Sequence, residues 1–193
     1  MTPLVLLNPG CNYGTGRKRW ENVSPGLRER IGEFDLVEFR PGAFLAAVAA
    51  IFFGYANFVV MGYFKDISAD RKTGYNTFPV RFGWAANAVY SDLVAMGAAV
   101  GSGLAIWLSG RLNWLGAAVF VVGLAVNIWA QVAIHGIRDE AKSHGPIANV
   151  VRAFVLYCLA MVLTMKPGWV LPAALFYGAF ELVLKFRPER AQV

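Results

Sequence analysis

The sequence predicts an all-α protein: a polytopic transmembrane helical bundle of about five helices, preceded by a short α/β-like arm. Composition is the first reason, because 57% of the 193 residues are hydrophobic and only 16% are charged, which is more apolar than a soluble domain. The second reason is a series of apolar runs, since about 20 apolar residues cross a bilayer. The runs are 43–64, 85–108, 114–134, 150–165 and 169–184. We therefore expect an integral, multi-pass membrane protein.

The apolar runs differ in length, and length decides how each is expected to cross the bilayer. The first three are long enough to span it. The last two are shorter, and only the turn signal Lys166-Pro167-Gly168 separates them. They form either two tilted spans or a hairpin that enters and leaves one face, and both choices leave the C-terminus on the same side. All the runs are rich in Gly and Ala, which lets helix backbones approach closely in lipid.

Basic residues predict the orientation, because cytoplasmic loops of membrane proteins are rich in Lys and Arg. If the 64–84 loop is cytoplasmic, the 135–152 loop and the C-terminal tail are cytoplasmic too. The ten cations on this side are Lys65, Arg71, Lys72, Arg81, Arg138, Lys142, Arg152, Lys185, Arg187 and Arg190. The other side has only Arg111, Lys166 and the six basic residues of the arm. We expect a bacterial-type inner or plasma membrane, with the 64–84 loop in the cytoplasm and the arm outside.

The arm resembles the opening of a soluble α/β domain, because two short strand-like runs flank a helical stretch. The expected elements are a strand at 4–7, a Gly-containing turn at 8–16, a helix at 17–31 and a second strand at 34–39. One βαβ fragment cannot bury its own core, so an ordered remnant or a flexible tail is the alternative to a working domain. The expected divisions of the chain are an arm at 1–42, a membrane domain at 43–187 and a tail at 188–193.

The turn of the arm reads Asn8-Pro-Gly-Cys-Asn-Tyr-Gly-Thr-Gly16, and a basic run to Trp20 follows it. This segment resembles the N-terminal nucleotide-binding segment of the diacylglycerol kinase and related lipid kinase family. Arg40-Pro41-Gly42 is similar to the region after that family's second strand. The Gly-Gly-Asp-Gly motif that completes the nucleotide site in that family is absent from this chain. A lipid kinase anchored by helices is therefore the least favoured function.

A charged segment from Tyr63 to Gly83 lies between two apolar runs. Its acids, Asp66 and Asp70, are one helical turn apart, so their carboxylates face one way. The cations beside them are Lys65, Arg71, Lys72 and Arg81. Mg²⁺ is usually bound by one or two carboxylates together with substrate phosphates, and Lys and Arg neutralise the remaining phosphate oxygens. The pattern predicts a site for a divalent metal and a phosphorylated substrate, with an ordinary basic cytoplasmic loop as the alternative.

Part of this segment reads Lys65-Asp66-Ile67-Ser68-Ala69-Asp70-Arg71, followed by Gly74, Thr77, Pro79-Val80 and Gly83. It resembles the second aspartate motif of the UbiA-type intramembrane prenyltransferases. In that family an Asp-x-x-x-Asp-Arg box runs into a Gly-x-x-Thr-x-Pro-Val segment at the cytoplasmic end of a transmembrane helix. The Gly, Thr and Pro positions make the signal more specific than a pair of acids alone. The resemblance extends over residues 43 to 187.

The resemblance implies half of a UbiA-like bundle and a transferase reaction. An isoprenoid diphosphate would ionise, and its allylic carbon would alkylate an aromatic or other acceptor. By carry-over, Asp66 and Asp70 would be the catalytic residues that hold Mg²⁺. The candidates for diphosphate contact are Lys65, Arg71 and Lys72, with Arg81 a weaker one. The implied partners are the isoprenoid diphosphate, the prenyl acceptor and membrane lipid, and no nucleic acid is expected.

The chain also departs from the family. Members normally have a first acidic motif, Asn-Asp-x-x-Asp-x-x-x-Asp, in an earlier loop, and residues 1–42 have no acids at that spacing. Some members have a third acid in the second motif, where this chain has Tyr63. Two carboxylates alone would hold bridging Mg²⁺ ions poorly. We therefore expect the chain to be inactive by itself, or to need a separate chain that supplies the first half. A non-catalytic membrane protein that binds a polyprenyl lipid is the alternative.

Other polar residues in or near the apolar runs allow more than one interpretation. Asn57, just before the box, either reaches a prenyl pocket or bonds to neighbouring helices. Glu181 lies four residues before Lys185, and this spacing predicts a pair on one helix. Residues with loosely metal-like spacing are His135, Asp139 and His144. Because glycines and a proline interrupt that stretch, we expect it to be an amphipathic cytoplasmic loop.

Overall fold

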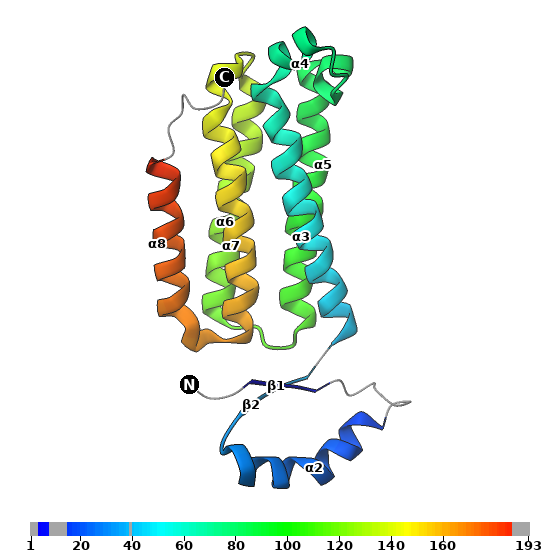
Figure 1. Cartoon of the computed structure of the whole chain (residues 1–193), viewed down its shortest axis with the longest axis vertical. Coiled ribbons are helices and arrows are strands. Elements are labelled where there is room, and N and C mark those ends of the chain that lie inside the picture. Colours follow the sequence, from blue (N-terminus) through cyan, green and yellow to red (C-terminus); the bar gives the residue numbers. More distant parts are fainter. Residues whose placement is uncertain (1–3, 8–14, 39, 187–193) are drawn as a thin grey trace.

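A long apolar segment crosses lipid as a helix, because a helix pairs its own backbone groups. The chain follows this rule in the computed structural model, which describes residues 4–7, 15–38 and 40–186. Figure 1 shows the long helices of the bundle, which are α3 (Pro41–Gly62), α5 (Phe78–Leu108), α6 (Trp114–Gly136), α7 (His144–Met165) and α8 (Val170–Phe186). Five helical segments of the described chain are long and apolar enough to cross a membrane. The predicted all-α transmembrane bundle is confirmed.

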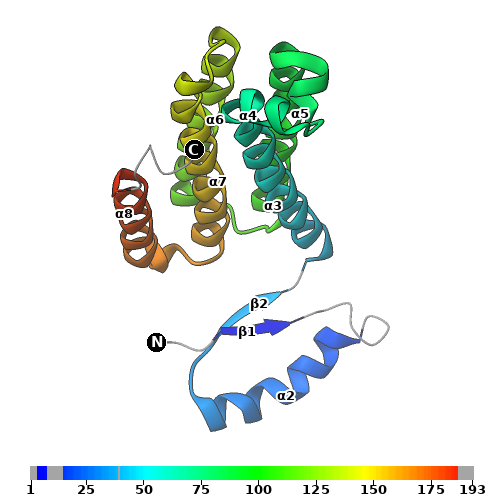
Figure 2. The same ribbon diagram turned by 45° about the horizontal axis from the view of Figure 1, so that its top comes forward.

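Four of these helices, α3, α5, α6 and α7, stand side by side and alternate in direction (Figures 1 and 2). α3 packs along α5 and α6 packs along α7, and less extensive contacts join the two pairs. α8 lies outside the four, next to α7. The chain turns into α8 through η3 (Pro167–Trp169). The last two apolar runs therefore form two antiparallel helices.

Small residues lie where paired helices approach each other most closely. A Cβ added to Gly101 in α5 would lie 2.8 Å from the backbone nitrogen of Ala50 in α3. A Cβ added to Gly116 in α6 would lie 3.1 Å from the Cα of Thr164 in α7. Both helix pairs therefore depend on glycine at their contact, as the composition of the apolar runs predicts.

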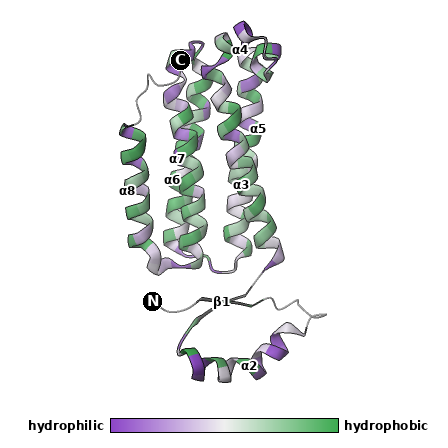
Figure 3. Ribbon diagram, viewed as in Figure 1, coloured by the Kyte–Doolittle hydropathy of each residue, from purple (hydrophilic) through white to green (hydrophobic). Residues whose placement is uncertain are grey.

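The long helices expose large apolar side chains. Figure 3 shows that these helices are mainly hydrophobic along their length, whereas α2 (Gly16–Ile31) and the region of α4 (Ile67–Thr73) are more hydrophilic. Examples from different helices are Leu45, Leu93, Trp107, Val132 and Val183, each more than half exposed. Apolar surface of this extent is rare on soluble proteins but is the normal outer face of a membrane bundle. A buried apolar cluster that includes Met61, Phe64 and Ile134 fills the interior near the end of α3.

The helices extend beyond the apolar runs at several ends. α5 begins at Phe78 rather than near residue 85, with Pro79 in its first turn, where a proline is well tolerated. Gly83, with φ of 84°, then breaks the helical conformation, so a short turn precedes the long part of α5. α7 begins at His144 rather than near residue 150. The apolar runs therefore predicted the hydrophobic part of each helix but not the first turns that precede it.

The arm forms the predicted βαβ unit at the end of the bundle where α3 begins (Figures 1 and 2). β1 (Leu4–Leu7) and β2 (Asp35–Glu38) pair in parallel, and α2 (Gly16–Ile31) connects them. The ring of Trp20 in α2 meets that of Phe34 edge to face, with 5.6 Å between centroids. The predicted turn at 8–16, apart from its last two residues, and the predicted tail at 188–193 lie outside the described residues.

Candidate functional site

The charged segment from Tyr63 to Gly83, called the aspartate segment from here on, begins with two short helices at the end of the bundle opposite the arm (Figure 1). α3 passes into η1 (Tyr63–Lys65), and α4 (Ile67–Thr73) begins directly after Asp66. Asp66 occupies the N-cap position of α4, and its carbonyl accepts a hydrogen bond from the Asp70 nitrogen at 2.8 Å. The two acids are therefore one helical turn apart, as their spacing predicts.

Residues that follow the box hold Asp70 in place. Gly74 ends α4 with φ of 80°, a left-handed conformation that favours glycine. The chain then turns back, and Thr77 Oγ1 donates a hydrogen bond to Asp70 Oδ2 at 2.9 Å. Pro79 lies in the first turn of α5, which begins immediately afterwards. The spacing thus has a structural reason: Gly74 makes the turn that brings Thr77 to the Asp70 carboxylate, and Pro79 stands in the first turn of the next helix.

The four predicted cations all lie at this end of the bundle, in different surroundings. Lys65 Nζ is 4.0 Å from Asp66 Oδ2, at the limit of an ion pair. The two basic residues in the last turn of α4 are exposed. The guanidinium carbon of Arg81 lies 5.5 Å from the centroid of the Phe82 ring, within reach of a cation–π interaction. Lys65 is therefore the cation that the structure brings against a box carboxylate, whereas Arg81 lies against an aromatic ring.

The acids of the segment suit one kind of metal site and not another. Within residues 4–7, 15–38 and 40–186, no three His, Cys, Asp or Glu side chains are grouped so that they could hold a metal ion. Mg²⁺ often keeps several waters and binds one or two protein carboxylates together with substrate phosphates. Asp66 and Asp70 fit that mode of binding. They do not fit a metal site that protein ligands close by themselves.

A residue outside the motif, Glu140, also holds the segment. It lies in η2 (Glu140–Lys142), in the connection between α6 and α7. Its Oε1 accepts a hydrogen bond from the Ser68 nitrogen at 2.9 Å, and its Oε2 accepts one from Ser68 Oγ at 2.7 Å. A carboxylate is favourable in this place, because the first N–H groups of a helix lack partners within the helix. No local pattern signals the contact, since the two residues are 72 positions apart.

The connection that contains Glu140 is shorter than the predicted cytoplasmic loop. His135 lies in the last turn of α6, which ends at Gly136, and His144 is the first residue of α7. The prediction that these histidines share an irregular loop with Asp139 is therefore correct for Asp139 only. The physical reason is that Gly136 ends one helix and Pro146 stands in the first turn of the next, where proline is tolerated.

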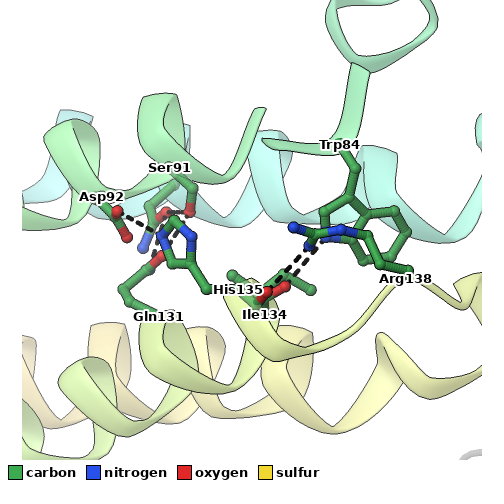
Figure 4. A network of polar contacts seen from close by, with 8 residues as sticks. Trp84, Ser91, Asp92, Gln131, Ile134, His135 and Arg138 are labelled. Atoms are coloured by element: carbon green, nitrogen blue, oxygen red, sulfur yellow. Dashed lines mark hydrogen bonds and ion pairs between the residues drawn. The ribbon is translucent and has the colours of Figure 1, made fainter. Parts of the chain in front are cut away.

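Below the aspartate segment, polar side chains cross the bundle interior and join α3, α5 and α6 (Figure 4). Ser91 Oγ lies 2.8 Å from Asn57 Oδ1 and 2.9 Å from Gln131 Oε1. Nearby, Trp84 Nε1 donates a hydrogen bond to the carbonyl of Ile134 at 3.0 Å. Asn57 is only 2% exposed. Of the two interpretations of Asn57, the structure shows the bonding between helices, which stabilises helix association in lipid.

Glu181 pairs with a different cation from the one predicted. Arg152 Nε donates to Glu181 Oε1 at 2.8 Å, and Arg152 Nη2 donates to Glu181 Oε2 at 2.9 Å. The prediction that Lys185 is the partner is wrong, because a guanidinium on α7 offers two parallel hydrogen bonds that an ammonium cannot match. Among the residues of α8, only Ala173 is buried. This pair is therefore a major contact between α8 and the rest of the bundle.

Comparison with known proteins adds no relative to these observations. No protein-family model, no curated protein and no solved structure matches the chain. The resemblance to the prenyltransferase motif therefore depends on the residues of the aspartate segment.

Proposed function

We propose that the membrane domain is the half of a UbiA-type intramembrane prenyltransferase that contains the second aspartate motif. In this proposal the aspartate segment binds an isoprenoid diphosphate together with Mg²⁺, and the prenyl chain lies among the apolar helices. The first aspartate motif is not among these 193 residues, so in this proposal they bind substrate by themselves without transferring it. The excess of cations at this end of the bundle supports a cytoplasmic position for the segment.

The observation that supports the proposal best is the way the segment holds its acids. Thr77 donates to the Asp70 carboxylate at 2.9 Å, and Gly74 makes the turn that brings Thr77 there. Asp66, one turn earlier, remains 46% exposed at its side chain. One fixed carboxylate and one accessible carboxylate at the end of a membrane helix suit a metal that also binds a diphosphate from the adjoining lipid.

Each residue has a specific role in this proposal. When bound, Mg²⁺ neutralises the charge that develops on the departing diphosphate. Asp66 and Asp70 would hold the metal with its diphosphate at the end of α3. Lys65, Arg71 and Lys72 donate hydrogen bonds to phosphate oxygens that the metal leaves uncovered. The apolar helices exclude water from the allylic carbon, which prevents its hydrolysis.

Binding of geranyl diphosphate by the full chain in lipid nanodiscs tests the proposal. We expect saturable binding with Mg²⁺ that disappears when EDTA removes the metal. Asp66→Asn and Asp70→Asn should each weaken binding by about tenfold or more, because each removes a charged ligand. Asp139→Asn, which changes an acid at the same end of the bundle, is the control and should bind normally. Binding that needs no Mg²⁺, or equal affinity of all these variants, would contradict the proposal.

A second candidate is a protein that binds a polyprenyl lipid without transferring it. The small number of acids favours it, since the described residues contain no group of three metal-ligating side chains. In that case a polyprenol should bind as well as a prenyl diphosphate, and EDTA should change neither affinity. Asp66→Asn and Asp70→Asn should then have no effect, which separates this candidate from the first.

A further inference from the structure

A groove lies between α5 and α6, and it is separate from the aspartate segment. Its volume is about 280 Å³, close to the lower end of the range for small-molecule sites. On α5 the small side chains of Ala95 and Ala99 line it. The lining residues Met96, Ile128 and Val132 are each more than half exposed. The groove is therefore open to the lipid that surrounds the bundle.

A close contact between an aspartate and a histidine stands at one end of the groove. Asp92, which lines the groove, places its Oδ2 2.7 Å from His135 Nε2 in the last turn of α6 (Figure 4). The two side chains are 40% and 41% exposed. An ionisable side chain that faces lipid is costly and often marks a functional site. Asp92 Oδ1 has no hydrogen bond to any of the described residues, so it is an open acceptor at the head of the groove.

A second acceptor without a donor lies in the wall of the groove. Asn127 lines the groove and is 4% exposed. Its Nδ2 donates to the Tyr157 hydroxyl at 3.1 Å and to the Ala95 carbonyl at 3.4 Å. Its Oδ1 is buried without a partner in the described part of the chain. Leaving a buried acceptor unpaired costs free energy, so a ligand that donates a hydrogen bond suits this groove.

We propose that this groove binds a membrane-soluble molecule with a hydroxyl headgroup, an alcohol or a phenol. Its hydroxyl donates to the Asp92 carboxylate, and such a bond to a charged acceptor is stronger than one between neutral groups. Its apolar body lies along the face of α5 that has small side chains, beside Ala95 and Ala99. An ether or ketone of the same shape binds poorly, because it adds an acceptor where acceptors are already unpaired. The proposal does not depend on prenyl transfer.

A pair of matched probes tests the hydroxyl. 4-Octylphenol and 4-octylanisole differ by one methyl group on the oxygen, so only the phenol can donate a hydrogen bond. Their binding to the full chain in lipid nanodiscs is measured by equilibrium dialysis, with uptake by empty nanodiscs subtracted. We expect saturable binding of the phenol, about tenfold tighter than that of the anisole. Equal affinities, or uptake explained by the lipid alone, would overturn the proposal, and this comparison needs no variant.

Variants test the location of the site. Ala99→Leu fills the groove, whereas Val100→Leu changes the next residue, which is exposed and does not line it. Ala99→Leu should weaken binding of the phenol by about tenfold, the loss expected when a contact site is blocked, and Val100→Leu should leave it unchanged. Asp92→Leu should remove the preference for the phenol over the anisole. Equal affinity of Ala99→Leu and the unchanged chain, or an unchanged preference in Asp92→Leu, refutes this site.

Discussion

The Glu140 carboxylate accepts two hydrogen bonds from Ser68, one from the backbone nitrogen at 2.9 Å and one from the hydroxyl at 2.7 Å. Ser68 lies in α4 between the two acids of the box, whereas Glu140 lies in the connection between α6 and α7. One side chain therefore joins two connections at the same end of the bundle. The position of the aspartate segment depends on a residue far from it in the sequence.

Replacing this carboxylate should loosen the aspartate segment. Glu140→Gln removes the charge and one of the two acceptor oxygens, so we expect the amide hydrogens of α4 to exchange about tenfold faster. Hydrogen–deuterium exchange measured by mass spectrometry on the full chain checks this. Lys142→Gln is the control, because Lys142 belongs to the same short helix and its side chain is 73% exposed. Equal acceleration in both variants would mean that Glu140 does not hold α4.

Removing the Thr77 hydroxyl should release Asp70. Thr77→Val keeps the branched shape but cannot donate to the carboxylate, so we expect a loss of about 1 kcal/mol in unfolding free energy. Binding of geranyl diphosphate with Mg²⁺ should weaken as well, since Asp70 is no longer oriented. Thr77→Ser keeps the hydroxyl and should preserve both properties. If Thr77→Val and Thr77→Ser had the same melting temperature and the same affinity for geranyl diphosphate, the hydrogen bond would have no role.

Replacing a glycine by alanine should destabilise the protein where α3 packs closely on α5, and should have little effect on the exposed side of α8. A Cβ at Gly101 would lie 2.8 Å from the backbone nitrogen of Ala50, which cannot move aside easily. Gly101→Ala should therefore destabilise the bundle by about 1–3 kcal/mol. Gly178 in α8 has nothing within 4 Å of an added Cβ, so Gly178→Ala should be neutral or stabilise its helix by up to about 1 kcal/mol. Thermal unfolding in detergent separates the two, and equal melting temperatures would contradict this packing.

The pair between Arg152 and Glu181 should decide whether α8 stays on the bundle. Arg152→Lys and Glu181→Gln each lose the two parallel hydrogen bonds, so we expect losses of about 1–3 kcal/mol in unfolding free energy. The double variant should lose less than the sum of the two, because both changes remove the same interaction. Lys185→Gln should leave the unfolding free energy unchanged, because Arg152 and not Lys185 is the partner of Glu181. A larger loss in Lys185→Gln than in Arg152→Lys would contradict the pairing.

The bundle could be predicted from the sequence because few backbone conformations of an apolar chain are stable in lipid. A span of about 20 apolar residues has to pair its own backbone, and a helix does so locally. The aspartate segment was also predictable in part. The spacing of Asp66 and Asp70 indicates one helical turn, and Gly74 and Thr77 occupy positions whose local roles the structure explains. These features depend on neighbours within a few residues.

The contacts between distant segments could not be predicted in the same way. Glu181 has a cation four residues later on its own helix, but its partner is Arg152 on α7. Ser68 and Glu140 meet because α3 and α6 end at the same height, which no local pattern encodes. The apolar run at 85–108 did not include the first turn of α5, because that turn contains the charged residue Arg81. Tertiary packing decides such contacts, whereas periodicity describes single helices.

The alternation of the long helices has a consequence for the supply of reactants. α3 is the one long helix between the arm and the aspartate segment, so a single crossing of the membrane by α3 puts the two in different aqueous compartments. A water-soluble molecule such as ATP then reaches one of them and is shut off from the other by the bilayer. Water-soluble molecules at the arm and at the aspartate segment therefore come from separate pools, and a molecule dissolved in the membrane has access to both.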